Sequence, residues 1–425
     1  MLQCRKNGTN VGVVVLSWSL VTCRGTLRRI HLLGMNIALV IERMDAAHEE
    51  RAAPTTQLAD ALSRAGHDVT VLCQAGQAVD GVELRELPAP GLTRRARLTK
   101  FSGAVSAVAG EYDIVHAMLP LPGANVVQFL DGTVPGRAAA DRRRRGPVLG
   151  PLLAALAPLC RRRKLRARLE TAAMADRSVL VLPASRMVAD EIDLHYSRRD
   201  NVRVLRPAVT AETFSDDERL EHRQHLRRQL GLADDEMLFL TVAEDFVRQG
   251  VAETIEAFGR WYRQARRRGR LVVIGRDRIE CEGYVRHAAM RDLGQACVFL
   301  SREDGDARGA GLARWYAAAD VNVLLSWYDP SSRAVLEAAA LGVASITTVQ
   351  SGAGELLTDG TGVVVDSPRD TNGVVAAMHT LTGPAARTAA REKCLALRPK
   401  LTMQQHVLEL LDAYKVTVST PSRTP

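Results

Sequence analysis

The sequence predicts an α/β protein made of two Rossmann-like, doubly wound parallel-sheet domains. Two observations predict this fold class. The 425 residues are 46% hydrophobic and 25% charged, an ordinary globular composition in a chain too long for one hydrophobic core. From residue 35 onward, short apolar runs alternate with segments of helical periodicity, which is the pattern of βα units. In such sheets the carboxyl ends of the strands meet at a crevice where ligands bind, so we expect the two domains to face a cleft.

The first domain is expected over residues 35–208. Its predicted strands are the buried apolar runs Met35–Glu42, Asp68–Cys73, Asp113–His116 and Ser178–Leu182. A helix is predicted from about Pro54 to Ala65, because proline suits a first helical turn. Ser185, after the last of these strands, has the side chain of a helix N-cap.

The second domain is expected over residues 209–383, after the polar stretch Thr210–Gly231, in which an Arg-rich helix follows Ser215–Glu218. Its predicted strands are Leu238–Ala243, Leu271–Gly275, Cys297–Ser301, Val321–Leu325, Ala344–Thr348 and Gly362–Asp366. Its predicted helices are 251–266, 282–293, 311–319 and 332–341. Residues 384–416 are expected to form two helices without a strand, and 417–425 a disordered tail.

Residues 1–34 are predicted to be an extension outside the fold. A basic pair precedes the apolar stretch Val11–Val21 and then Cys23, an order also found in signal peptides and lipoprotein anchors. That stretch is about half the length needed to span a bilayer. Because Met35 begins a clean strand, we interpret 1–34 as an upstream extension or a misassigned start, with lipidated Cys23 as the alternative.

The positive charge of the chain is concentrated in one segment. The net charge is +9, but residues 142–168 hold ten Lys or Arg and no acid, and the remainder has 47 basic against 48 acidic residues. Basic clusters that flank an apolar stretch are typical of docking on an anionic membrane surface. The alternative is a solvated insert, because 51 Arg against 6 Lys indicates codon bias. No aromatic residue lies between Phe129 and Tyr196, so stacking platforms for nucleic acid are missing and none is expected as a partner.

Several function classes are excluded by missing motifs. The seven cysteines contain no C-x-x-C pair, which argues against a metal site and favours a reducing, cytoplasmic location. Neither the dinucleotide fingerprint G-x-G-x-x-G after the first strand nor a P-loop occurs. Asp304-Gly-Asp306 is interpreted as a solvated loop, because two carboxylates rarely make a magnesium site alone. No metal and no cofactor are therefore expected.

The segment Trp327–Gly342 contains the candidate binding residues, where a strand leads through a proline and two serines into a helix. N–H groups near Ser331 and Ser332 at a helix N-terminus would present positive charge to a phosphate. Glu337, two turns from Asp329, has the acceptor oxygens that a nucleoside ribose requires. The alternative is that Glu337 is a carboxylate on a helix face.

The chain resembles family 4 of the retaining nucleotide-sugar glycosyltransferases, which have the GT-B fold, especially the lipopolysaccharide-core glucosyltransferase type. The resemblance covers residues 35–415, and these segments carry it: Met35–Arg43, Asp113–Pro120, Ser185–Asp190, Trp315–Asp320 and Asp329–Gly342. The family binds its donor through an E-x(7)-E motif and a basic pair. This implies donor contacts from Glu337, from Asp329 in the first glutamate position, and from Arg248, besides Ser331 and Ser332.

The resemblance also implies an activity: transfer of a sugar from a UDP-glucose-like donor, with retention and without a metal, to an envelope glycan or lipopolysaccharide-type glycolipid. It places the enzyme at the inner face of the cytoplasmic membrane. It identifies no catalytic residue.

Five departures from the family pattern fall at chemically demanding places. Gln249 stands where a Lys is expected, Asp45–Arg51 replaces a Gly-rich loop, and His116-Ala-Met118 replaces His-x-His. Asn125 replaces an Asp, and Pro207–Thr210 replaces Asn-Gly-Val-Asp. Two hypotheses follow: an active transferase, or a catalytically inactive paralogue that acts as a binding or scaffold partner. Another GT-B activity, such as a sugar epimerase or phosphorylase, is a third.

Overall fold

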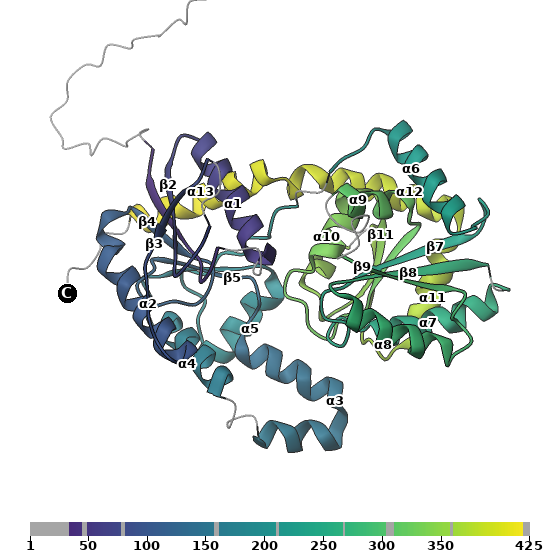
Figure 1. Ribbon diagram of the computed structural model, residues 1–425, viewed down its shortest axis with the longest axis horizontal. Helices are drawn as coiled ribbons and strands as arrows, with labels where there is room; N and C mark the ends of the chain where they lie inside the picture. The colour runs from purple at the N-terminus through teal and green to yellow at the C-terminus, as the bar shows by residue number, and fades with distance from the viewer. Residues whose placement is uncertain are drawn as a thin grey trace, which may run out of the picture.

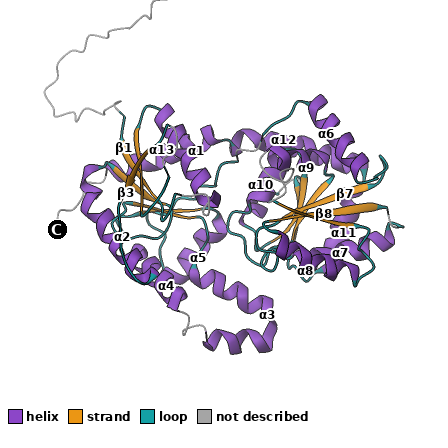
Figure 2. Ribbon diagram, in the orientation of Figure 1, coloured by secondary structure: helices purple, strands orange, loops and turns teal. Residues whose placement is uncertain are grey.

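The protein consists of two α/β domains, each built on a six-stranded parallel sheet, and this confirms the predicted fold class (Figures 1 and 2). The computed structural model describes residues 34–44, 49–77, 81–156, 161–209, 212–266, 268–302, 310–357 and 360–419. Predictions for 1–33, for most of the Asp45–Arg51 loop, for Asp304-Gly-Asp306 and for the end of the tail lie outside the described residues.

The first sheet has the strand order β3-β2-β1-β4-β5-β6. Its strands are β1 (Asn36–Val40), β2 (Asp68–Cys73), β3 (Glu83–Glu86), β4 (Ile114–Ala117), β5 (Val126–Phe129) and β6 (Leu180–Pro183). Its helices are α1 (Glu49–Arg64), α2 (Arg94–Val108), α3 (Val134–Leu156), α4 (Arg161–Ala175) and α5 (Arg186–Tyr196). Helix α1 begins at Glu49 and holds Pro54 inside it, so the predicted start at Pro54 was wrong. Ser185 caps α5 as expected, with its Oγ accepting from the N–H of Val188.

The second sheet has the order β12-β11-β10-β7-β8-β9. Its strands are β7 (Met237–Val242), β8 (Gly269–Gly275), β9 (Cys297–Ser301), β10 (Val321–Leu324), β11 (Ala344–Thr348) and β12 (Gly362–Val365). Its helices are α6 (Asp216–Gln229), α7 (Val251–Gln264), α8 (Arg278–Ala289), α9 (Ala310–Ala318), α10 (Arg333–Ala340), α11 (Thr371–Thr382) and α12 (Pro384–Leu397). Helix α8 starts earlier than the predicted residue 282, because Asp277 caps it by accepting from the N–H of Glu280.

The last helix, α13 (Met403–Ser419), crosses from the second domain to the first, where it runs beside α1 (Figure 1). Leu410 and Tyr414 are fully buried in the core of the first domain. The Tyr414 hydroxyl lies 2.7 Å from Nδ1 of His116, and burial lowers the pKa of that histidine to about 3, so it is neutral. His116 therefore anchors α13.

Asp320, after α9, is the centre of a buried ionic network. Its carboxylate lies 2.6 Å from Arg223 and 3.2 Å from Arg227, and it also accepts from the backbone N–H of Leu238 at 2.8 Å. The side chains of Arg227 and Asp320 are 4% and 3% exposed. The network fastens α6 to the start of β7.

The two domains meet through Tyr328, which follows β10. Its hydroxyl donates to Glu191 of α5 at 2.7 Å and accepts from the N–H of Thr133 at 3.0 Å. Glu355 of the second domain accepts from the N–H groups of Arg186 and Met187, at the start of α5. The Tyr328 contacts hold the start of α3 against the loop after β10, and the Glu355 contacts hold the start of α5 against the second domain.

No helix among the described residues is long and apolar enough to cross a membrane.

Candidate functional site

Polar side chains gather at the carboxyl ends of β7, β9 and β10, where ligands of parallel sheets bind. They are Glu244, Arg248 and Gln249 after β7, Arg302 after β9, Asp329 after β10 and Glu337 on α10. The site therefore unites three of the predicted residues, Arg248, Asp329 and Glu337, and adds three that sequence reasoning did not select.

Gln249 and Asp329 contact each other. The Gln249 amide donates to Oδ2 of Asp329 at 3.1 Å, and its Oε1 accepts from the backbone N–H groups of Glu244 at 2.7 Å and Asp245 at 3.0 Å. Burial raises the pKa of Asp329, against the opposing effect of the Gln249 hydrogen bond. Gln249 thus fixes the loop after β7 and supports a buried carboxylate.

Ser331 and Ser332 lie directly before α10. The helix begins at Arg333, and Ser332 is its cap residue in a left-handed conformation, φ 36° and ψ 69°. The N–H of Ser332 donates to Oδ1 of Asp329 at 2.7 Å, so it is engaged within the protein. The buried Oγ of Ser332 has no partner among the described residues, and Ser331 is half-buried. The Ser332 N–H is thus used by Asp329, and a phosphate contact from the N–H groups near Ser331 and Ser332 stays a prediction.

Glu337 lies on α10 with its side chain 14% exposed. Its Oε2 accepts from the Tyr316 hydroxyl and its Oε1 from Arg333, both at 3.3 Å. Burial raises its pKa, and Arg333 and Arg302 act in the opposite direction. The carboxylate keeps unfilled acceptor capacity, since each oxygen has two lone pairs.

Arg302 follows β9 directly and extends the site toward the sheet edge. Its Nη1 donates to Oε1 of Glu244 at 3.0 Å, and its buried Nε has no partner among the described residues. A signal for it was present in the sequence, because it is the first residue after the predicted strand Cys297–Ser301.

Two arginines approach the site from opposite domains. Arg248 is held by the N–H of Trp327, which donates to its carbonyl at 2.8 Å, and by Asp245, whose Oδ2 is 3.5 Å from its Nε. Arg137 lies in the first turn of α3, one turn after Thr133, which Tyr328 contacts. Within the described part of the chain, the Arg137 guanidinium makes no hydrogen bond and no ion pair.

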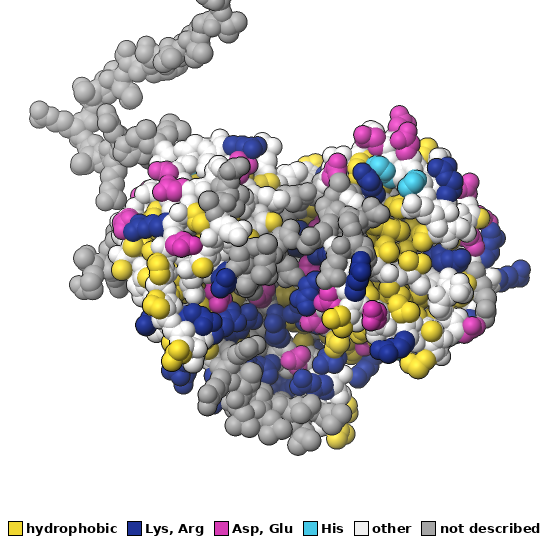
Figure 3. All heavy atoms as spheres, viewed as in Figure 1, with side chains coloured by type: hydrophobic (Ala, Val, Ile, Leu, Met, Phe, Trp, Pro, Cys, Tyr) yellow, Lys and Arg dark blue, Asp and Glu magenta, His cyan; other side chains and the backbone are white. Residues whose placement is uncertain are grey.

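Burial lowers the pKa of Arg137, and the neighbouring Arg248 lowers it further. Figure 3 shows Lys and Arg side chains gathered in the groove between the domains. The groove therefore presents arginine side chains from both domains, which suits an anionic ligand. No local sequence pattern marks Arg137, because only the docking of α3 brings it to this place.

Among the described residues, no group of three or more His, Cys, Asp or Glu side chains is arranged to hold a metal ion.

Two family models match the chain, one for each domain. The model of glycosyltransferase family 4 matches residues 55–213, and that of glycosyl transferases group 1 matches residues 236–383.

Two curated relatives were found. Lipopolysaccharide glucosyltransferase WaaG of Escherichia coli is 22% identical over 320 residues, which is 73% of this chain and 80% of WaaG. An uncharacterized glycosyltransferase of Methanocaldococcus jannaschii is 28% identical over 188 residues, 42% of this chain and 45% of that protein. The chain thus spans less than half the length of the archaeal relative.

Solved structures share the fold. The crystal structure of WaaG superposes with a TM-score of 0.68 at 20% identity, covering 90% of this chain and 100% of that one. HepE of Anabaena in complex with UDP-glucose gives 0.60 at 16% identity, covering 89% and 100%. Sucrose-phosphate synthase of Thermosynechococcus elongatus gives 0.66 at 20% identity, covering 89% and 98%.

Proposed function

The chain belongs to glycosyltransferase family 4, and from this premise we propose that it transfers a sugar from a UDP-glucose-like donor with retention of configuration. The observation that carries the proposal is the convergence of Arg248, Arg137 and Glu337 at the groove between the domains. A nucleoside diphosphate needs cations for its phosphates and an acceptor for its ribose, and these side chains supply both.

Each residue has a defined part in this proposal. Arg248 and Arg137 flank the diphosphate and stabilise the negative charge that develops on it as the sugar leaves, so the charge is neutralised by protein cations without a metal. Glu337 accepts hydrogen bonds from the ribose hydroxyls. Asp329 fixes the loop between β10 and α10, which would contact the donor sugar. Its two carboxylate oxygens already accept hydrogen bonds from Gln249 and from the N–H of Ser332.

For the acceptor we propose an envelope glycan of the lipopolysaccharide type, on the similarity to WaaG. We further propose that segment 142–168 docks the protein on the anionic inner face of the cytoplasmic membrane. Each Lys or Arg near such a surface contributes about 1 kcal/mol. Flotation with anionic and with neutral liposomes tests this, and equal partitioning into both would contradict it.

The donor proposal is tested by calorimetry with UDP and UDP-glucose, followed by a sugar-transfer assay in which NMR identifies the anomer formed. We expect saturable binding of both ligands and a retained anomer. Absence of UDP binding at millimolar ligand would overturn the proposal. Binding without transfer would instead favour the inactive paralogue that serves as a partner protein.

The role of Glu337 has a sharper test. We expect the protein to prefer UDP over 2′,3′-dideoxy-UDP, and Glu337→Ala to abolish that preference because the ribose hydroxyls lose their acceptor. Glu392, which lies exposed on α12, gives the matched control Glu392→Ala, which should keep the preference. An undiminished preference in Glu337→Ala would remove Glu337 from the site.

A further inference from the structure

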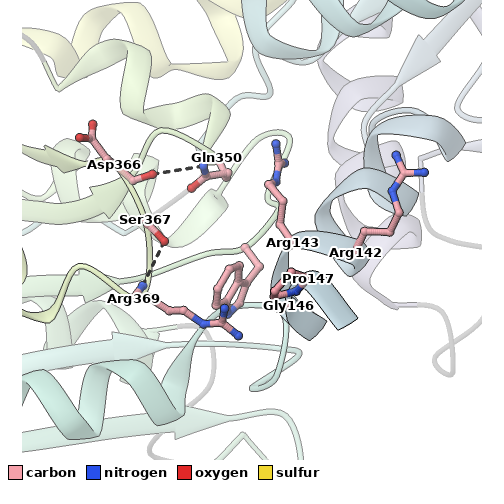
Figure 4. A pocket seen from close by; sticks show the side chains of 9 residues that line it. Arg142, Arg143, Gly146, Pro147, Gln350, Asp366, Ser367 and Arg369 are labelled. Carbon is pink, nitrogen blue, oxygen red and sulfur yellow. Dashed lines mark hydrogen bonds between the residues drawn. The ribbon is translucent and has the colours of Figure 1, made fainter. Parts of the chain in front are cut away.

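A cavity of about 490 Å³ lies where helix α3 meets the second domain (Figure 4). This volume is within the range of small-molecule sites. Arg142 and Arg143 line it from α3, and Trp327, Gln350, Asp366 and Arg369 line it from the loops after β10, β11 and β12. Part of the basic segment is thus turned toward the other domain.

The cavity adjoins the donor site, since the backbone N–H of Trp327 donates to the Arg248 carbonyl, but Arg248, Asp329 and Glu337 do not line it. The Trp327 indole N–H donates to Glu253 of α7 at 3.1 Å, and Arg369 lies two residues before α11. Helices α7 and α11 pack on one face of the second sheet, whereas α10, which carries Glu337, lies on the opposite face (Figure 1). A ligand here and a donor at Glu337 would lie on opposite sides of the segment after β10.

Positive charge dominates the cavity. Among the described residues, Arg142, Arg143 and Arg369 have no ion-pair partner, and Asp366 is the acidic residue that lines the cavity with them. Figure 4 shows Arg143 and Arg369 reaching into the space from opposite sides. Such a constellation favours an anion, because guanidinium groups bind phosphate oxygens through charge-assisted hydrogen bonds.

Arg369 is held in place by neutral groups. Its guanidinium lies 5.1 Å from the centre of the Trp327 ring, and its Nη2 donates to the carbonyl of Arg144 at 2.7 Å. That carbonyl is available because α3 is kinked at Gly146, φ 82° and ψ −179°, which interrupts the helical hydrogen bonds there. Because the Trp327 ring and the Arg144 carbonyl carry no net charge, they fix the Arg369 guanidinium without neutralising it, and its positive charge can attract an anionic ligand.

A group that binds hydroxyls lies beside these cations. Nε2 of Gln350 donates to the carbonyl of Asp366 at 3.3 Å, but its buried Oε1 has no partner among the described residues. A buried acceptor of this kind costs free energy unless a ligand donates to it. The exposed Asp366 carboxylate points away from Gln350 (Figure 4), so Gln350 Oε1 is the acceptor that faces this space.

We propose that this cavity binds a phosphorylated saccharide, with its phosphate on Arg143 and Arg369 and its hydroxyls on Gln350. This proposal rests on the proposed function, because the phosphorylated saccharide would be part of the glycan acceptor to which the sugar is transferred. The cavity then recognises an anionic sugar of the acceptor. The segment after β10 lies between this sugar and the donor.

The test is calorimetry on the full chain with glucose 6-phosphate, glucose and inorganic phosphate, with UDP titrated into the same samples. We expect saturable binding of glucose 6-phosphate that is at least tenfold tighter than that of either glucose or phosphate. Arg369→Gln should weaken it at least tenfold and leave UDP binding unchanged. Arg260, exposed on α7, gives the control Arg260→Gln, which should change neither affinity.

Three results would overturn the proposal: no saturable binding of glucose 6-phosphate, equal affinity for inorganic phosphate, or competitive displacement by UDP. The last would place the sugar phosphate in the donor site. If UDP binds and glucose 6-phosphate does not, this inference fails while the proposed function stands. If the reverse holds, the donor proposal fails and the cavity remains a sugar-phosphate site.

Discussion

Arg137→Met is expected to stabilise the unliganded protein and at the same time to weaken UDP binding. Arg137 is half-buried, and its guanidinium makes no hydrogen bond or ion pair in the described part of the chain, although the charge of Asp131 attracts it. Burial and the positive charge of Arg248 both disfavour the charge of Arg137, as its lowered pKa indicates. Methionine has a similar length and no charge, so it keeps the packing and removes the repulsion.

The two effects have different sizes. Removing a buried and repelled charge is expected to raise the free energy of unfolding by roughly 1 kcal/mol, which corresponds to an increase in Tm of about 2 °C for a domain of this size. Removing a charge-assisted contact to the diphosphate costs about 1.5–3 kcal/mol, so the Kd for UDP should rise roughly 10- to 100-fold.

Differential scanning fluorimetry without ligand measures the first effect, and calorimetry with UDP measures the second. Arg260→Met, on an exposed part of α7, is the control and should change neither value. A Kd within twofold of the wild type would show that Arg137 does not contact the diphosphate. A fall in Tm would refute the repulsion between Arg137 and Arg248.

Three further changes test the framework around the sites. Asp320→Ala should lower the free energy of unfolding by about 3–5 kcal/mol in denaturant titrations, because it leaves the buried charge of Arg227 unpaired. Burial raises the pKa of Glu170 to about 7, so the folded state binds more protons than the unfolded state and loses stability as pH rises from about 4.5 to 7. Glu170→Gln should therefore gain roughly 2 kcal/mol relative to the wild type between pH 5 and pH 8, measured as the difference in unfolding free energy. Gln249→Lys should tighten UDP binding about tenfold and cost roughly 1–2 kcal/mol of stability, since a lysine cannot accept from the two loop N–H groups.

Almost continuously apolar strands were predictable, including the edge strands β6, β9 and β12, whereas β3 and β5 were not predicted. The run Met237–Val242 is buried at every position, so its residues are almost continuously apolar. Edge strand β3, Glu83–Glu86, is charged at three of its four positions. An edge strand has a neighbouring strand on one side only, so its side chains can stay partly exposed to solvent. Strand β5, Val126–Phe129, is too short to show a pattern beside the glycine and aspartate residues around it.

The site was predictable where a strand end marks it. Arg248 and Asp329 follow the ends of β7 and β10 within a few residues, and the carboxyl ends of parallel strands are where ligands bind. Arg137 belongs to the other domain, and its place depends on the contact between Tyr328 and Thr133. Arg369 owes its position to a kink in α3 far away in the sequence. Contacts of this kind leave no local periodicity.

The contact between Gln249 and Asp329 bears on whether the site has decayed. Both positions depart from the family pattern, yet the amide of one donates to the carboxylate of the other at 3.1 Å. Independent loss would have left the buried carboxylate short of a donor, at a cost of about 1–3 kcal/mol. A matched donor and acceptor, together with the cation of Arg137, favour a rearranged donor site over an abandoned one. A double-mutant cycle with Gln249→Met and Asp329→Ala should accordingly give a coupling energy of about 1 kcal/mol or more, and additive effects would contradict this argument.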